Sequence, residues 1–309
     1  MVITLFSSCT TTPADNESAT GDTDSTSGIS IVTTIFPIYD WVKNITGSAV
    51  NVVYFDENGI DLHSFEPTAD NIITLSSADL FICIGGTSDE WVDNAVKSSG
   101  NENLQVLRLM EITGVLEEET VEGMEADHEE ADITEYDEHV WLSLKKAQTA
   151  VRSIADALCG IDPDNADMYR KNAENYINGL KALDGKYEAA IASAKGNTLL
   201  FADRFPFRYL TEDYSLEYYA AFPGCSAESE ASFETMAFLI EKTKELKLDD
   251  IIVLEGSDRK IASTVAAETG ARIVMLDSCQ SVTKKDVADG KTYISVMEEN
   301  LKVITEALS

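Results

Sequence analysis

Apolar residues follow two alternating patterns along this chain, and each pattern predicts a different kind of element. Short apolar runs rich in β-branched residues predict buried strands, whereas apolar residues spaced three and four apart predict helices. The predicted strands are 29–36, 50–55, 79–84, 104–109, 198–202, 217–222, 251–254 and 273–276. The predicted helices are 38–45, 68–75, 90–96, 143–158, 205–214, 232–246, 259–269 and 293–307. Strands that alternate with helices predict an α/β fold with parallel sheets and helical crossovers.

The longest helical pattern lies in the middle of the chain, from Asp162 to Gly196. About 30 residues at 1.5 Å per residue would make a rod of roughly 45 Å. Two shorter helices broken at Gly179 or Gly185 are the alternative. We expect two lobes, each a mostly parallel sheet flanked by helices, joined by one long rigid helix. The expected parts are a signal remnant and tether at 1–28, an N-terminal lobe at 29–161, a linking helix at 162–196 and a C-terminal lobe at 197–309.

The start of the chain differs in composition from the rest. Cys9 follows a short apolar stretch with small residues directly before it, as at a bacterial lipoprotein processing site. The usual basic head is missing, so the stretch reads as a truncated signal segment. Residues 10–28 are almost all small or polar and cannot bury a core, which predicts a flexible tether. A lipidated Cys9 would hold the protein at a membrane surface, and an ordinary free cysteine is the alternative.

Composition and charge narrow the class of function. Apolar residues make up 44% and charged residues 25%, as in ordinary globular proteins, and no apolar run of about 20 residues predicts a membrane-spanning helix. The formal charge of −32 argues against a nucleic-acid partner, because a polyanion would be repelled. The five cysteines include no CxxC pair, so a cysteine-based zinc site is not expected. A disulfide between Cys225 and Cys279 is left open.

An acidic segment at 117–138 has no apolar periodicity. It holds 12 acidic residues around His128, and we expect a solvated loop. Such a loop could raise the local concentration of cations, or it could be a surface segment without a specific role.

A few side chains at the ends of predicted elements could bind a metal. The chain has three histidines, and two of them, His63 and His139, lie where a loop gives way to a helix. Asp203, Glu255 and Asp277 each follow a predicted strand directly. Ligands of open α/β sheets bind outside the carboxyl ends of the strands, so these five could converge. The alternatives are structural histidines and carboxylates that cap helices.

These residues resemble the motifs of the metal-specific substrate-binding lipoproteins of zinc and manganese ABC importers. The resemblance covers nearly the whole chain from about residue 29. His63 begins the sequence HSFEPT and His139 begins HVW, similar to the first two ligand motifs of that family. The resemblance implies a third ligand at Asp203, where the family has histidine or glutamate, and a fourth at Asp277. It further implies a two-lobed monomeric carrier without enzymatic activity, anchored outside the cytoplasmic membrane and delivering metal to a membrane permease.

The resemblance leaves the identity of the metal open. An aspartate at the third position departs from the family pattern, and a set of two imidazoles and two carboxylates suits both zinc and manganese. Many zinc-type members carry a histidine-rich acidic loop before the second histidine. The acidic loop here lies in the same place with only one histidine, and zinc is favoured over manganese. Glu255 is a possible additional or alternate ligand. The rival interpretations are a metal-dependent hydrolase, a carrier of an organic solute or metal chelate, and an adhesin-like surface protein.

Overall fold

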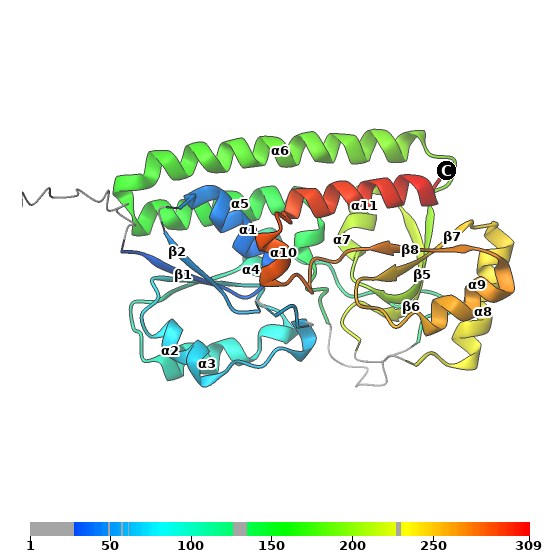
Figure 1. Ribbon diagram of the computed structural model, residues 1–309, viewed down its shortest axis with the longest axis horizontal. Helices are drawn as coiled ribbons and strands as arrows, with labels where there is room; N and C mark the ends of the chain where they lie inside the picture. Colours follow the sequence, from blue (N-terminus) through cyan, green and yellow to red (C-terminus); the bar gives the residue numbers. More distant parts are fainter. Residues whose placement is uncertain (1–27, 49, 57, 61, 126–134, 227–229) are drawn as a thin grey trace, which may run out of the picture.

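Two four-stranded sheets lie side by side, and all of their strand pairs are parallel (Figure 1). The computed structural model describes residues 28–48, 50–56, 58–60, 62–125, 135–226 and 230–309. Cys9, the rest of the expected tether up to residue 27, and His128 lie outside these ranges. The α/β fold with two parallel sheets flanked by helices is confirmed.

The two sheets share one pattern of connections. The first has the order β2-β1-β3-β4, and the second has the order β6-β5-β7-β8. The first sheet consists of β1 Ser30–Thr33, β2 Asn51–Tyr54, β3 Leu80–Cys83 and β4 Gln105–Arg108. The second consists of β5 Thr198–Phe205, β6 Glu217–Pro223, β7 Asp250–Leu254 and β8 Arg272–Leu276. In each sheet the chain reverses its direction of winding beside the first strand, which is where α/β proteins bind ligands.

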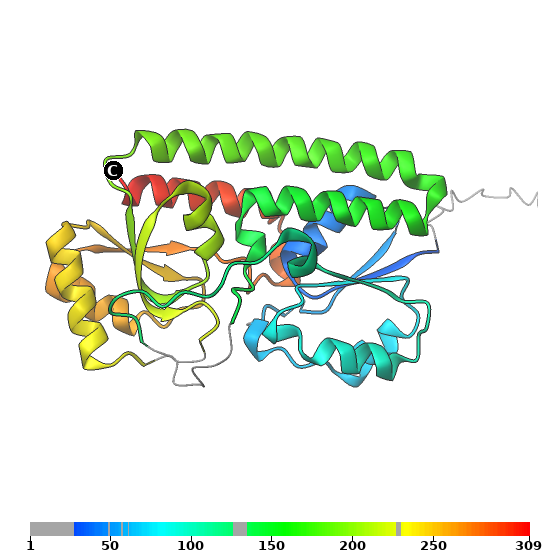
Figure 2. The same cartoon turned by 180° about the vertical axis from the view of Figure 1, so that it is seen from behind.

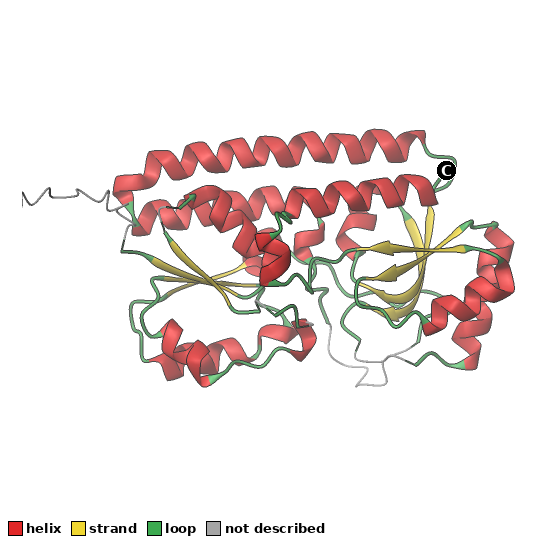
Figure 3. Ribbon diagram, viewed as in Figure 1, coloured by secondary structure: helices red, strands yellow, loops and turns green. Residues whose placement is uncertain are grey.

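Helices cover both faces of the sheets (Figure 3). In the first half they are α1 Phe36–Thr46, α2 Ala69–Leu75, α3 Trp91–Ser99, α4 Leu109–Thr113 and α5 Leu144–Ile161. In the second half they are α7 Arg208–Tyr214, α8 Phe233–Leu246, α9 Lys260–Thr269, α10 Lys284–Ala288 and α11 Tyr293–Ala307. The sequence missed α4 and α10, which have five residues each and are too short to show a period.

The first strand ends earlier than its apolar run predicts. β1 ends at Thr33, and α1 begins at Phe36, so Pro37 lies in the first turn of a helix rather than closing a strand. A proline costs nothing there, because the N–H that it lacks would have no partner within the helix.

Helix α6, Ala166–Ser193, is one uninterrupted helix of 28 residues, preceded by a short 3₁₀ turn. At 1.5 Å per residue it is about 42 Å long. Both views show it along one side of the whole molecule, over α5 and α11 (Figures 1 and 2). Asn172 of α6 donates to the carbonyl of Ile45, and Tyr187 donates to the carbonyl of Met297. The same helix therefore binds elements of both halves.

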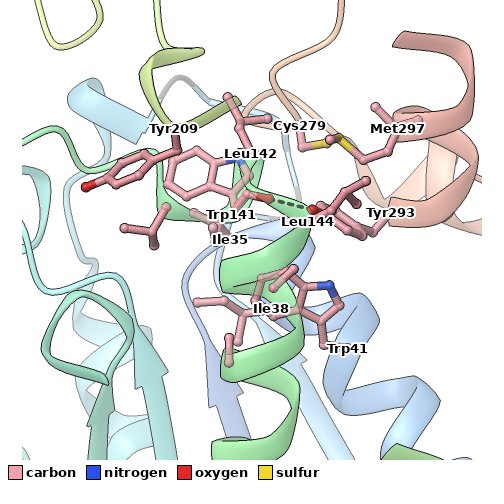
Figure 4. Packing of buried hydrophobic residues seen from close by; sticks show 14 of the residues in the cluster. Ile35, Ile38, Trp41, Trp141, Leu142, Leu144, Tyr209, Cys279, Tyr293 and Met297 are labelled. Atoms are coloured by element: carbon pink, nitrogen blue, oxygen red, sulfur yellow. Dashed lines mark hydrogen bonds between the residues drawn. The ribbon is translucent and has the colours of Figure 1, made fainter. Parts of the chain in front are cut away.

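One apolar cluster continues from the first half of the chain into the second. At its centre, Trp41 and Tyr293 pack edge to face with ring centroids 5.3 Å apart. The Tyr293 hydroxyl donates to the carbonyl oxygen of Trp141 at 2.5 Å (Figure 4). All three side chains are fully buried, so the two halves share a core.

The acidic segment is not simply solvated, and this expectation is wrong for its described ends. Met124 and Asp137 are buried. Glu119 pairs with Arg208 at 3.2 Å, and the N–H of Glu125 donates to the carbonyl of Ala221 on β6. The carboxylates tolerate this burial because backbone and side-chain donors of both halves bind them. Among the described helices, none combines the length and the apolar character needed to cross a membrane.

A glycine in α6 offers a test of its continuity. Gly185 is exposed, and a Cβ placed on it meets no atom within 4 Å. Alanine favours a helix over glycine, so Gly185→Ala should raise the free energy of unfolding by about 0.5–1 kcal/mol. Urea and thermal unfolding measure the change.

The matched control is a glycine-to-alanine change where there is no room. Gly123 has a φ of +82°, and a Cβ on it would overlap the ring of Phe238. Gly123→Ala should therefore destabilise the protein. A Gly185→Ala variant less stable than the wild type would count against one continuous helix.

Candidate metal centre

The loop after β2 carries His63, and the turn after β3 orients it. His63 lies in a 3₁₀ turn, and its Nδ1 is 2.8 Å from the Ser88 hydroxyl. Ser88 does not cap the following helix, because Glu90 occupies that position, and its hydroxyl contacts the imidazole instead. The backbone N–H of Ser88 donates to Glu138 at 2.9 Å. Because Nδ1 is engaged, Nε2 is the ring atom left to face a ligand.

His139 is held in the same way by a carboxylate. Its Nδ1 lies 3.2 Å from an oxygen of Asp137, and its backbone N–H donates to the same oxygen at 2.8 Å. The side chain is fully buried, and its Nε2 has no hydrogen-bond partner among the described residues. A carboxylate behind one ring nitrogen is the usual way to fix an imidazole that binds metal through the other.

The two imidazoles meet a thiol from the second half of the chain. The ring centroids of His63 and His139 are 5.6 Å apart. One ring nitrogen of each and the sulfur of Cys225 all lie within 4.8 Å of one another. Among the described residues this is the one group of three or more potential metal ligands that converges so closely. Because imidazole and thiolate suit borderline transition metals, the group can hold such a cation.

The loop that delivers Cys225 follows β6 and needs a glycine. A Cβ on Gly224 would lie 2.8 Å from the carbonyl oxygen of Phe205 and 3.1 Å from Cε1 of His139. The N–H of Cys225 donates to a carboxylate oxygen of Glu118 at 3.1 Å. The acidic segment therefore fixes the cysteine as well as the second histidine.

The charges around the group favour a cation. Burial lowers the pKa of His139, but the carboxylates of Asp137, Glu138 and Glu118 outweigh it and leave this pKa raised. Burial raises the pKa of the Cys225 thiol, and the same three carboxylates raise it further. Without metal the thiol is therefore protonated. A bound cation would offset the repulsion that now opposes its ionisation.

Asp203, predicted as the third ligand, does not join this group. The predicted strand ends at 202, but β5 continues to Phe205 with an irregular register between Phe201 and Arg204. Asp203 consequently lies inside the strand. Its carboxylate accepts the N–H groups of Arg204, at 2.9 Å, and of Leu254 on β7, at 3.2 Å.

Asp277, predicted as the fourth ligand, also has other partners. It directly follows β8 as expected. One oxygen accepts the N–H of Cys279 at 2.8 Å, and the other pairs with Lys291 at 2.7 Å. The lysine already neutralises this carboxylate, and the carboxylate holds the loop after β8 in place.

Glu255, the possible alternate ligand, binds the same loop. It follows β7, and its two oxygens accept the N–H and the hydroxyl of Ser278 at 2.7 and 2.6 Å. The Ser278 carbonyl in turn accepts the indole N–H of Trp141 at 2.8 Å. Glu255 is therefore linked through Ser278 to the indole of Trp141, which lies two residues after His139.

Comparisons with known proteins identify the family of the chain. Residues 31–307 match the family described as ZnuA, zinc-uptake complex component A, periplasmic. The chain belongs to this family.

The relatives are similar along most of this chain. The high-affinity zinc uptake system protein ZnuA of Bacillus subtilis is 31% identical over 300 residues, 95% of this chain and 92% of that protein. The zinc-binding lipoprotein AdcA of Streptococcus pneumoniae is 32% identical over 283 residues, which are 90% of this chain. The chain spans 55% of the length of that AdcA. The crystal structure of the Zn(II)-bound ZnuA-like domain of AdcA superposes with a TM-score of 0.73 at 30% identity, covering 91% of this chain and 98% of that domain.

For this member of the ZnuA family, the residue that sequence reasoning missed is Cys225. It was considered only as a disulfide partner of Cys279, yet both are free thiols in the structure. The signal that could have found it is position. Cys225 follows strand β6 as Asp277 follows β8. Both residues lie beyond the carboxyl ends of parallel strands, where ligands of such sheets bind.

The carboxyl group of Glu255 predicts a pH dependence of stability. Burial raises the pKa of Glu255 from 4.5 to about 7, and the charge of Asp277 adds to the rise, although hydrogen bonds from Ser278 oppose it. An acid with a higher pKa in the folded than in the unfolded state favours folding while protonated. The free energy of unfolding should therefore fall as the pH rises from 4.5 to about 7.

The contribution of Glu255 can be isolated by substitution. Urea unfolding of metal-free protein across this pH range should show a shallower fall for Glu255→Gln than for the wild type. Glu241→Gln, at an exposed position of α8, is the control and should keep the wild-type slope. Equal slopes for Glu255→Gln and the wild type would contradict the assignment.

Proposed function

We propose that this protein is the extracytoplasmic substrate-binding subunit of a zinc ABC importer. It captures Zn²⁺ at His63 and His139, between the two sheets, and hands it to a membrane permease. The observation that carries the proposal is the pair of imidazoles, each oriented through Nδ1, that converge with a third donor atom within 4.8 Å. The relatives named as zinc-binding and zinc-uptake proteins support zinc as the substrate.

The remaining predicted residues take supporting places in this proposal. Cys9 would carry the lipid that keeps the carrier at the membrane, in line with the lipoprotein name of the streptococcal relative. Asp203 would fix the strands beside the cation and Asp277 the loop after β8, rather than bind it, because both carboxylates already have partners.

A hydrolase is the nearest rival, because three protein ligands are also typical of catalytic zinc sites. Catalysis needs substrate access to the open metal position. Here His139 is fully buried, and the Nε2 atoms of both histidines are shielded from solvent. The enclosed site favours carriage of a bare ion.

Removing either imidazole should abolish tight zinc binding. Loss of an outer-shell partner costs about 10–100-fold in metal affinity, so loss of a direct ligand should cost more than about 100-fold. Competition with a chromophoric chelator measures the affinity of His63→Ala and His139→Ala. Growth of cells that depend on this carrier in zinc-limited medium tests delivery.

Two sets of controls sharpen this test. His128→Ala, which changes the third histidine of the chain, should leave the affinity at the wild-type value. Asp203→Asn and Asp277→Asn should still bind one zinc ion. Retention of full affinity by both ligand-histidine variants would refute the site, and a loss in Asp203→Asn as large as in His139→Ala would return that aspartate to the ligand set.

Zinc affinity should depend on pH with a known sign. Imidazole binds metal only when neutral, so protons compete with zinc. Because the pKa of His139 is raised above 6.5, the fall in affinity on acidification should begin at a higher pH than for an ordinary imidazole. Chelator competition between about pH 8 and pH 6 measures the profile.

The Asp137→Asn variant separates this cause from general instability. It removes the charge that most raises the pKa of His139, so its profile should move to lower pH while its affinity falls about 10–100-fold. An affinity independent of pH in the wild type would contradict the proposal.

A further inference from the structure

The third donor of the proposed zinc site is a sulfur atom. We propose that the thiolate of Cys225 is a direct metal ligand and that this sulfur makes the site select zinc over manganese. The inference rests on the proposed function, and it names the residue that sets the choice of metal. A single cysteine would not support this inference by itself. The sulfur, however, lies within 4.8 Å of an imidazole nitrogen of His139, and the buried Nε2 of that ring has no hydrogen-bond partner among the described residues.

The backbone around Cys225 is arranged to bring the sulfur to this place. Gly224 passes so close to His139 and Phe205 that any Cβ would collide with the Phe205 carbonyl. The N–H of Cys225 is held by Glu118, and the N–H of Ser226 closes a turn onto Pro223. The residue before Cys225 therefore has to be a glycine, which lets the chain pass beside His139.

The other cysteines show the contrast. Cys83 and Cys279 are fully buried, and both belong to the apolar packing of the core. Cys159 lies on α5, where its sulfur contacts the carbonyl of Ala166. Cys225 alone among the four described cysteines joins a group of potential metal ligands.

The charge balance is consistent with a thiolate. On binding, the S–H bond breaks, a bond between sulfur and metal forms, and the proton leaves to solvent. The thiolate then supplies one negative charge, and Asp137 supplies a second through His139. Together they balance the two positive charges of the ion, which makes its burial tolerable.

Sulfur also decides between metals. Thiolate is a soft ligand that suits zinc, whereas manganese prefers carboxylate, carbonyl and water oxygens. A site of two nitrogens and one sulfur should therefore discriminate against manganese more strongly than the site with two aspartates that the sequence predicts. Replacement of Cys225 by a residue with an oxygen donor should narrow the difference between the zinc and manganese affinities.

Cobalt substitution of the full chain tests the ligand directly. Co²⁺ bound by a thiolate gives an intense sulfur-to-metal charge-transfer band in the near ultraviolet. We expect this band in the wild type and in Cys159→Ser, the matched control, and its loss in Cys225→Ser. Cys225→His should recover metal affinity without the band.

Competition between Zn²⁺ and Mn²⁺ tests the selectivity. The zinc-to-manganese affinity ratio should fall at least about tenfold in Cys225→Asp relative to the wild type. Thermal unfolding of the metal-free variants confirms that they fold.

As a second measure of ligation, Zn²⁺ should protect Cys225, but not Cys159, from alkylation, with the modified residues mapped by mass spectrometry.

The outcomes separate this inference from the proposed function. Failure of the wild type to bind Zn²⁺ would refute the proposed function itself. Tight zinc binding without a thiolate band, without protection of Cys225 and with unchanged selectivity in Cys225→Asp would leave the function standing and overturn the cysteine ligand.

Discussion

The site depends on a short buried segment, residues 137–143, that hydrogen bonds from the second half of the chain hold in place. Buried backbone groups need partners, and here the partners are side chains. The Tyr209 hydroxyl donates to the carbonyl of Asp137, and the Tyr293 hydroxyl donates to that of Trp141. The indole N–H of Trp141 donates to the carbonyl of Ser278. His139 lies within this segment, so its direction is set by both halves at once and cannot change without breaking buried bonds.

The same segment explains why acidic side chains persist in a protein interior. Asp137 orients an imidazole, and Glu138 accepts the N–H of the serine that orients the other. Glu118 fixes the loop of the thiol. Each carboxylate thus has a donor, and each also contributes a field that favours a cation at the centre. These three carboxylates supply the nearby counter-charge that a buried dication would need.

Much of the fold could be read from the sequence, but the site only in part. The strands and α6 follow from apolar periodicity, which reports local burial. His63 and His139 stand out because the chain has so few histidines. Asp203 was expected directly after its strand, but an irregular register lengthens β5 past it, and such a shift leaves no trace in a pattern of apolar residues. Cys225 was missed because its partners lie far away in the chain, and a search for closely spaced cysteines cannot detect a mixed site.

The shared core limits how the proposed carrier can open. Helix α6 packs against elements of both halves, and one apolar cluster joins them, so wide separation of the lobes would expose buried area at a cost of about 25 cal/mol per Å². The three proposed ligands differ in burial: His139 is fully buried, while His63 and Cys225 are partly exposed. Under the proposed function, the ion therefore enters and leaves by movement of the loops that carry these two residues, with His139 as the fixed point. A carrier built this way can release its ion through local loop motion while the fold stays intact.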